Sequence, residues 1–199
     1  MHQIILASQS HRRKQLLEWA EQPFISVPAH TAEEIPEGVA VQDVPVHIAR
    51  EKALTVKKNL ATFEARRFVP EEGVPILAAD TIVLLGTEII NKPANRADAI
   101  AILTRLSGQI HQVITGVVIL DGEKEISFSD ITEVEFHPLT QDQIEFYVDK
   151  YEPYDKAGAY AIQEWIGVIG IKSIKGDFYN VMGMPISRVM QALQACFTK

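Results

Sequence analysis

The chain has 199 residues, a hydrophobic fraction of 47%, a charged fraction of 23% and a formal net charge of −7. This length and composition fit one globular unit with a sizeable core or two small lobes, and they argue against large-scale disorder. The negative charge argues against a nucleic-acid partner, because general affinity for nucleic acid comes from clustered lysines and arginines.

The sequence also indicates a cytoplasmic protein without disulfides. Its single cysteine, Cys196, cannot form an intrachain disulfide. The short apolar stretch near the N-terminus has its charges on the wrong side for a secretory signal, and no segment reaches the ~20 apolar residues of a membrane span. We therefore expect a cytoplasmic location and no membrane partner.

The beginning of the chain predicts a strand, a tight turn and a helix. Residues 3–7 form a continuous apolar run, which is typical of a buried strand. Ser10 is a good N-cap for a helix that extends to Ala20. Residues 24–29 predict a second strand, and a loop rich in glutamate and proline follows it.

Two elements in the next part of the chain carry charged residues in apolar surroundings. A helix over residues 46–60 has apolar residues at helical spacing, and Lys52 lies beside that stripe. Residues 76–85 have the β-branched enrichment of a central strand, which Asp80 interrupts. An unpaired carboxylate in a buried strand is strongly unfavourable, so we expect a lysine or a divalent ion next to Asp80.

The rest of the chain continues the alternation of strands and helices. A short strand at residues 86–90 precedes a helix that begins near Pro93 and Asn95 and has Ile100, Leu103 and Leu106 on its buried side. The remaining expected elements are two strands joined by a DGEK hairpin (110–136), a helix (141–150), a loop (151–164), a strand pair (165–183) and a helix from Pro185. This order predicts an α/β fold with a mixed sheet.

The turn after the first strand is a candidate anion site. Arg12 and Arg13 stand where the helix begins, although cations are unfavourable at the positive end of a helix dipole. One explanation is solvated surface charge. The other is a bound phosphate, because a turn that leaves a buried strand offers backbone N–H groups and the helix dipole to an anion. No recognised phosphate-loop motif occurs, so the sequence pattern leaves both explanations open.

Acids and lysines elsewhere in the chain are further candidates for functional-site residues. Glu33, Glu34, Lys52 and Lys92 each have a structural or solvent-exposed role as the alternative. Asp80 stands out because of its buried strand, and carboxylate oxygens are the ligands that Mg²⁺ prefers.

The histidines argue against one kind of metal site, and Gln163 is a candidate for contacting a nucleobase. The six histidines have no paired spacing, which argues against a zinc site, and we expect His111 to be a local hydrogen-bonding residue. Gln163 carries an amide that could read the edge of a nucleobase, with a solvent-exposed loop glutamine as the alternative.

Segments spread over nearly the whole chain resemble the Maf family of nucleoside triphosphate pyrophosphatases. They are LASQSHRRKQLL, AREKA, AADTIV with the later NKP, LSGQIHQVITG, EPYDKAGAYAIQ and IKGDFYNVMGMP, in this order. The resemblance implies a mixed, elongated sheet flanked by helices. It also implies that residues 1–199 form a single Maf-like domain whose two lobes share a deep nucleotide-binding cleft. The implied activity is divalent-cation-dependent hydrolysis of a nucleoside triphosphate between its α- and β-phosphates, and many members are homodimers.

The resemblance also implies residue roles. Positions that match the family's catalytic residues are Asp80, Lys52, Lys92 and Glu34, with Asp80 and Glu34 as ligands of Mg²⁺ or Mn²⁺. Positions that match its substrate-binding residues are Ser8, Arg12, Arg13, Thr81 and Gln163. Arg12, Thr81 and Gln163 are similar to the branch that acts on dTTP and UTP. The branch directed at 7-methyl-GTP usually has a bulky aromatic residue in place of Arg12 and glutamine in place of Thr81. Pyrimidine nucleotides, canonical or modified, are therefore the expected substrates.

Two departures from the family pattern matter. His11 replaces the usual proline before the arginines, and TAEEIP is a loose version of the usual Asp-Glu-Thr stretch, so that register alone favours Glu34 over Glu33. The alternative function is a nucleotide-binding regulatory protein linked to septum formation, with little catalysis. The hydrolase interpretation requires the cationic turn and Asp80 to face one pocket.

Overall fold

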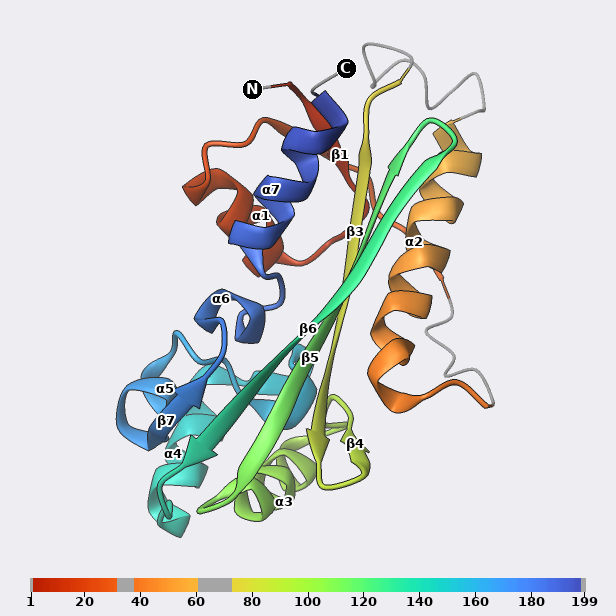
Figure 1. Ribbon diagram of the computed structural model, residues 1–199. Coiled ribbons are helices and arrows are strands. Elements are labelled where there is room, and N and C mark those ends of the chain that lie inside the picture. Colours follow the sequence, from red (N-terminus) through yellow and green to blue (C-terminus); the bar gives the residue numbers. More distant parts are fainter. Residues whose placement is uncertain (1, 32–37, 61–72, 198–199) are drawn as a thin grey trace. The chain divides into compact units, whose positions relative to one another are not determined.

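The structure is a computed structural model that describes residues 2–31, 38–60 and 73–197 (Figure 1). The chain divides into two compact units. The first comprises Met1–Asp80, Thr115–Asp130 and Gly183–Lys199, and the second Thr81–Ile114 and Ile131–Met182. The described strands form an open seven-stranded sheet in the order β2-β1-β3-β5-β6-β7, with β4 also paired to β3. Parallel and antiparallel pairs both occur, so the predicted α/β fold with a mixed sheet is confirmed.

In the first unit, two short parallel strands lie to one side of the strand that carries Asp80. β1 (Ile4–Leu6) pairs in parallel with β2 (Phe24–Ser26) and with β3 (Ile76–Leu85). The backbone N–H of Ala7 donates to the carbonyl of Leu77 at 2.8 Å, one residue before Ser8. The predicted strands are confirmed, although β1 and β2 are shorter than the predicted residues 3–7 and 24–29. The apolar runs of β1 and β3 are largely buried, as is typical of a parallel sheet covered on both faces, whereas β2 is half-buried.

The helices of the first unit cover both faces of its part of the sheet. Figure 1 shows α1 (His11–Trp19) and α7 (Ile186–Phe197) on one face and α2 (Val44–Leu60) on the other. The core on the α2 face consists of Ile5, Ala7, Ala49, Ala53, Val56, Ile76, Ala78, Val118 and Leu120. Since side chains alternate along a strand, the row of Ile76 and Ala78 on β3 continues with Asp80, which therefore points toward α2.

The first turn of α2 lies directly against β5 (Ile110–Asp121). A Cβ atom at Gly116 of β5 would lie 2.2 Å from the backbone nitrogen of Val46 and 2.3 Å from the carbonyl carbon of Pro45. The helix starts at Val44, two residues earlier than predicted, because Pro45 is tolerated in a first helical turn, where N–H groups have no helical partner.

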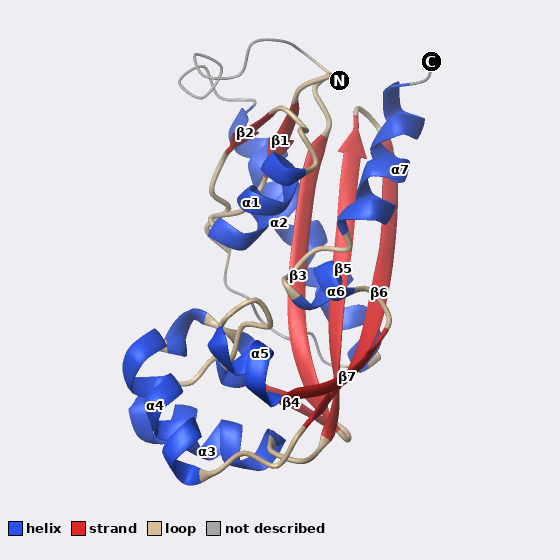
Figure 2. Ribbon diagram, turned by 90° about the vertical axis from the view of Figure 1, so that its left-hand side faces the viewer, coloured by secondary structure: helices blue, strands red, loops and turns tan. Residues whose placement is uncertain are grey.

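The second unit contains β4 (Glu88–Ile90), α3 (Arg96–Leu106), α4 (Gln141–Tyr151) and parts of β3, β5 and β6 (Lys124–Phe136). Figure 2 shows α3 and α4 side by side in this unit. Both helices begin at capping residues that the sequence provides. Asn95 accepts the N–H of Asp98 at 3.0 Å, and Thr140 forms a capping box with Gln143. On α3, Leu103 and Leu106 are buried as predicted, whereas Ile100 is half-buried and Ile102 is buried in its place.

The predicted strand pair over residues 165–183 is wrong. This segment forms the short helix α5 (Trp165–Gly170), the strand β7 (Ile171–Lys175) and the short helix α6 (Phe178–Val181). A Cβ atom at Gly167 would lie 1.7 Å from the carbonyl oxygen of Ile162, so glycine lets two backbones meet where the chain coils. The apolar, β-branched composition favoured a strand, but this close approach and the N–H of Gly167, which donates to Glu164 O at 2.9 Å, select a helix.

His111 is a buried hydrogen-bonding residue, as predicted. Its Nε2 lies 2.7 Å from the hydroxyl of Tyr160, its ring stacks on Phe136, and its buried Nδ1 has no hydrogen-bond partner among the described residues. Burial lowers the pKa of His111 from 6.5 to about 4. The same burial raises the pKa of the Tyr160 hydroxyl, so this pair stays neutral at physiological pH.

We expect the fold to lose stability between pH 6.5 and about 4 because of His111. As the pH falls, the unfolded chain binds a proton near pH 6.5, whereas the folded chain binds it only near pH 4, so the loss reaches about 3 kcal/mol at ~1.4 kcal/mol per pKa unit. Urea unfolding across this range should show a weaker pH dependence for His111→Gln than for wild type. The exposed His30→Gln is the control and should keep the wild-type dependence; equal slopes for all three proteins would contradict the assignment.

Candidate functional site

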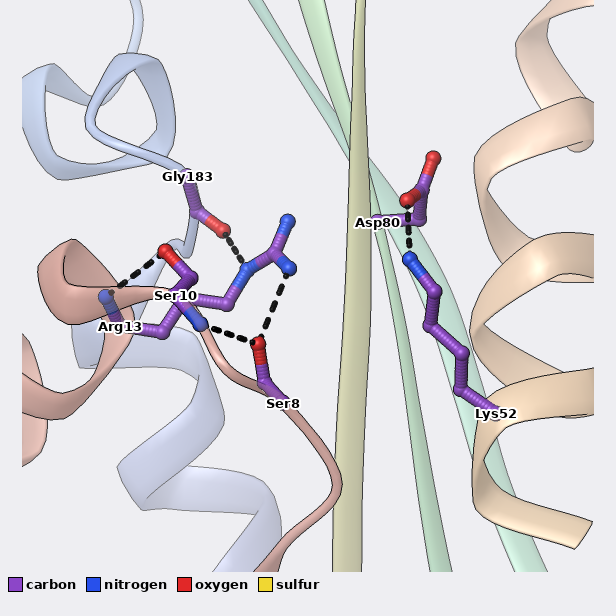
Figure 3. A network of polar contacts seen from close by, with 6 residues as sticks. All are labelled: Ser8, Ser10, Arg13, Lys52, Asp80 and Gly183. Carbon is purple, nitrogen blue, oxygen red and sulfur yellow. Dashed lines mark hydrogen bonds and ion pairs between the residues drawn. The ribbon is translucent and has the colours of Figure 1, made fainter. Parts of the chain in front are cut away.

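The turn after β1 and the start of α1 are held together by Ser8 and Arg13 (Figure 3). The hydroxyl of Ser8 accepts the N–H of Ser10 at 3.2 Å and Nη1 of Arg13 at 3.4 Å. Nε of Arg13 donates to the carbonyl oxygen of Gly183 at 2.9 Å. The Arg13 side chain is therefore buried and links the first turn of the chain to the segment that precedes α7.

The two arginines of the turn differ in their surroundings. Arg13 is buried, whereas Arg12 is half-buried, and Ser10 caps the helix by accepting the N–H of Arg13 at 3.5 Å. The first turn of α1 contains no acidic residue that would offset the helix dipole or these two cations. The guanidinium of Arg13 thus places a positive charge near the N-terminus of α1. A cation and a helix N-terminus close together favour the binding of an anion.

Lys52 and Asp80 form a buried ion pair on the other face of the same unit's sheet. Nζ of Lys52 lies 2.7 Å from Oδ1 of Asp80, and the two residues are 7% and 8% exposed. Lys52 comes from the middle of α2, between Ala49 and Ala53 of the core, and Asp80 comes from β3. Of the two expected partners of Asp80, a lysine or a divalent ion, the structure shows the lysine, and the two buried charges compensate each other.

The cationic turn and the ion pair lie on opposite sides of β3, so the expectation that they face one pocket stays a prediction. In Figure 3 Ser8 and Arg13 are on one side of this strand, and Asp80 and Lys52 are on the other. The described pairing of β3 with β1 ends at Leu77, and that with β4 begins at Val83. Asp80 therefore stands just beyond the carboxyl end of β1, where parallel sheets commonly place their ligands.

The other predicted site residues fall in the second unit or outside the described residues. Thr81 is half-buried on β3, whereas Lys92, between β4 and α3, and Gln163, before α5, are exposed. The turn at Gly158 connects their segments: its N–H lies 3.4 Å from the carbonyl of Asn91, next to Lys92, and a Cβ atom there would lie 3.0 Å from Val83, two residues after Thr81. Glu33 and Glu34 lie outside the described residues.

The residues present fit a divalent cation only as a shared site. In the described part of the chain no three histidine, cysteine, aspartate or glutamate residues cluster as they would around a metal held by protein alone. Asp80 offers one carboxylate, and Figure 3 shows its second oxygen pointing away from Lys52. One carboxylate, completed by substrate phosphates and water, is the donor set that Mg²⁺ commonly takes in phosphate-handling sites.

Three buried or half-buried polar residues near Gln163 were not predicted. Tyr147 and Lys156 each contact Glu164, which belongs to the turn that carries this glutamine. In the sequence, Tyr147 fits an apolar position of an amphipathic helix and gives no sign of a polar role. The only available signal was that Lys156 and Glu164 lie close to Gln163 in the sequence.

The open mixed sheet and the helices that flank it place this chain among the α/β proteins. The chain belongs to the Maf-like protein family, whose pattern it matches over residues 3–196. No helix of the described residues has the length and apolar character needed to cross a lipid bilayer.

Curated relatives cover almost the whole chain. A Cytophaga hutchinsonii protein is 45% identical over 98% of this chain and 84% of its own length. Proteins from Parabacteroides distasonis and Bacteroides thetaiotaomicron are 42% and 43% identical, each over 97% of this chain and 95% of its own length. All three are named dTTP/UTP pyrophosphatase.

Proposed function

We propose that this protein is a nucleoside triphosphate pyrophosphatase that hydrolyses dTTP and UTP to the monophosphate and pyrophosphate. The near full-length similarity to relatives of that name supports this activity. The structural observation that carries it is the buried Lys52–Asp80 pair, in the same unit as the cationic turn at Arg13. No observation favours a regulatory protein without catalysis. A cytoplasmic location, a homodimer and a nucleotide cleft shared by two lobes stay predictions.

In this proposal the chain's own residues bind and orient the triphosphate. Arg13 and Lys52 would contact phosphate oxygens from the two sides of β3, and Ser8 would hold Arg13 in place. Lys92 is proposed as a third phosphate contact. Phosphoryl transfer depends mainly on such positioning and on charge stabilisation, which these cations can supply.

Asp80 is proposed to orient the attacking water and to help hold a divalent cation, Mg²⁺ or Mn²⁺, with Glu34 as the second ligand. A bound divalent cation lowers the pKa of coordinated water and neutralises phosphate charge. Because the ammonium group of Lys52 already contacts one carboxylate oxygen of Asp80, we assign Asp80 to orienting the water and not to taking its proton. When Asp80 contacts the cation and the water in place of Lys52, the lysine becomes available to contact a phosphate oxygen.

Thr81 and Gln163 are proposed to select the base, and Arg12 is proposed as a further substrate-binding residue. Thr81 and Gln163 would hydrogen-bond O4 and the N3–H group of uracil or thymine. Cytosine presents the reversed donor and acceptor pattern, so it should be disfavoured by about 2 to 4 kcal/mol from unmatched polar groups.

The test is pyrophosphate release from dTTP, UTP, CTP and 7-methyl-GTP, each with Mg²⁺ or Mn²⁺. We expect rapid release from dTTP and UTP and a kcat/KM for CTP that is lower by roughly 30- to 1000-fold, the equivalent of the free-energy difference above. Release from none of the four would reject the enzyme. Similar values for CTP and dTTP would reject the base-reading residues while leaving the hydrolase in place.

A further inference from the structure

A group of polar side chains in the second unit encloses the turn that carries Gln163. Residues 161–164 form this turn, in which the N–H of Glu164 donates to the carbonyl of Ala161 at 3.1 Å. The hydroxyl of Tyr147 accepts the N–H of Ala161 at 3.1 Å and donates to the carboxylate of Glu164. A single hydroxyl group on α4 therefore binds both ends of the turn.

Lys156 supplies the positive charge that this arrangement needs. It is 8% exposed, and its ammonium group lies 3.6 Å from the carboxylate of Glu164 and 2.7 Å from that of Asp155. Glu164 is half-buried, so without this cation its negative charge would be poorly compensated. The hydroxyl, the carboxylate and the ammonium group consequently fix one another.

The backbone on both sides of the turn is constrained as well. On the C-terminal side, the carbonyl of Glu164 accepts the N–H groups of Gly167 and Val168 at the start of α5. On the N-terminal side, Ala159 has a φ of 58°, a left-handed conformation that a residue with a side chain adopts only where its surroundings impose it. The turn is rigidly built, yet the Gln163 side chain at its tip is exposed.

We infer that Tyr147, together with Glu164 and Lys156, is a positioning group that sets the orientation of Gln163 for reading the base. The inference rests on the proposed function, in which Gln163 contacts the base edge. An amide that turns over exchanges its donor and its acceptor, and the turned amide would match cytosine in place of uracil. Discrimination between these bases thus requires the amide to meet the base from one fixed position, and the Tyr147 hydroxyl holds the backbone from which Gln163 projects, through Ala161 and Glu164.

The experiment compares kcat/KM for UTP and for CTP in Tyr147→Phe, which removes only the hydroxyl. We expect the UTP-to-CTP ratio to fall about tenfold, through a lower value for UTP and a higher one for CTP. Glu164→Gln, which removes the charge that Lys156 balances, should change the ratio in the same direction. The matched control is Tyr151→Phe, one turn further along α4 and stacked on Tyr147 at 5.0 Å, which should keep the wild-type ratio.

A second set of variants separates positioning from stability. In a Gln163→Ala background, Tyr147→Phe should cause no further change in the ratio, because the residue it positions is gone. A merely structural role would lower the values for UTP and CTP equally, along with Tm, and would overturn the inference. If the wild type prefers UTP to CTP and Tyr147→Phe has the same UTP-to-CTP ratio, the inference is overturned while the proposed function stands. No release by the wild type would reject the proposed function and the inference with it.

Discussion

Replacing Asp80 by asparagine is expected to reduce kcat for pyrophosphate release from dTTP by at least about 100-fold, while a non-hydrolysable dTTP analogue still binds. The amide keeps the size of the side chain and can accept a hydrogen bond from Lys52, but it lacks the negative charge that the proposal assigns to orienting water and holding a cation. Pyrophosphate release and calorimetric binding of the analogue measure the two effects separately. Near-normal turnover would rule out the proposed role of Asp80.

A stability control is needed because the same change leaves Lys52 buried beside a neutral partner. The loss could reach about 3 kcal/mol, and a partly unfolded enzyme would also lose activity. Asp121→Asn is the matched variant, since Asp121 is another buried aspartate of the first unit, at the end of β5, and is not among the proposed site residues. It should retain turnover even where its unfolding free energy falls. If both variants lose activity in proportion to stability, the loss is structural in origin.

The sequence predicted the surroundings of Asp80 well because two simple periodicities meet there. Alternation along β3 places Asp80 in the row of Ile76 and Ala78, and helical spacing on α2 places Lys52 beside Ala49 and Ala53. Each pattern is local, and a buried carboxylate requires a partner. The sequence therefore predicted a lysine or a divalent ion beside Asp80 and placed Lys52 next to an apolar stripe, and the structure shows that these two residues, 28 positions apart, form the pair.

Other contacts of the site could not be predicted, because nothing local encodes them. The carbonyl of Gly183 that Arg13 binds lies 170 positions away, and a backbone acceptor leaves no mark in the sequence. The turn at Gln163 depends on Tyr147, whose buried ring fits the apolar stripe of α4 equally well without its hydroxyl contacts. The strand pair predicted over residues 165–183 is wrong for a related reason, since the approach of Gly167 to Ile162 is a tertiary contact that overrides a β-branched composition.

The position of Arg13 explains why a cation is stable at the start of α1. In the protein as described, its guanidinium is held by Gly183 and Ser8, so the charge is fixed near the helix N-terminus before any ligand binds. A pre-oriented cation loses little conformational entropy when it contacts a phosphate, and this favours tight positioning of the triphosphate. The two explanations left open by the sequence pattern are thus both incomplete: Arg13 is neither a solvated surface charge nor dependent on a ligand for its place.

Arg13→Lys is expected to lower kcat/KM for dTTP by about 100-fold and the unfolding free energy by about 1 to 2 kcal/mol. Lysine keeps the positive charge, but a single ammonium group cannot reproduce the planar fork that reaches Gly183 through Nε and Ser8 through Nη1. Arg13→Met removes the charge as well. If Arg13 contacts phosphate, the methionine variant should be several-fold less active than the lysine variant at similar stability, because only the lysine retains charge for the triphosphate.

The control for Arg13 is Lys14→Met, which removes the neighbouring half-buried cation of the same helix turn. It should leave kcat/KM within a few-fold of wild type, since a half-exposed charge interacts weakly through solvent. Chemical unfolding and steady-state kinetics on the three variants give the comparison directly. Equal activity of Arg13→Lys and Arg13→Met, with both reduced only as far as stability falls, would mean that Arg13 braces the turn without contacting the substrate, and that the anion at the start of α1 must be bound by other groups.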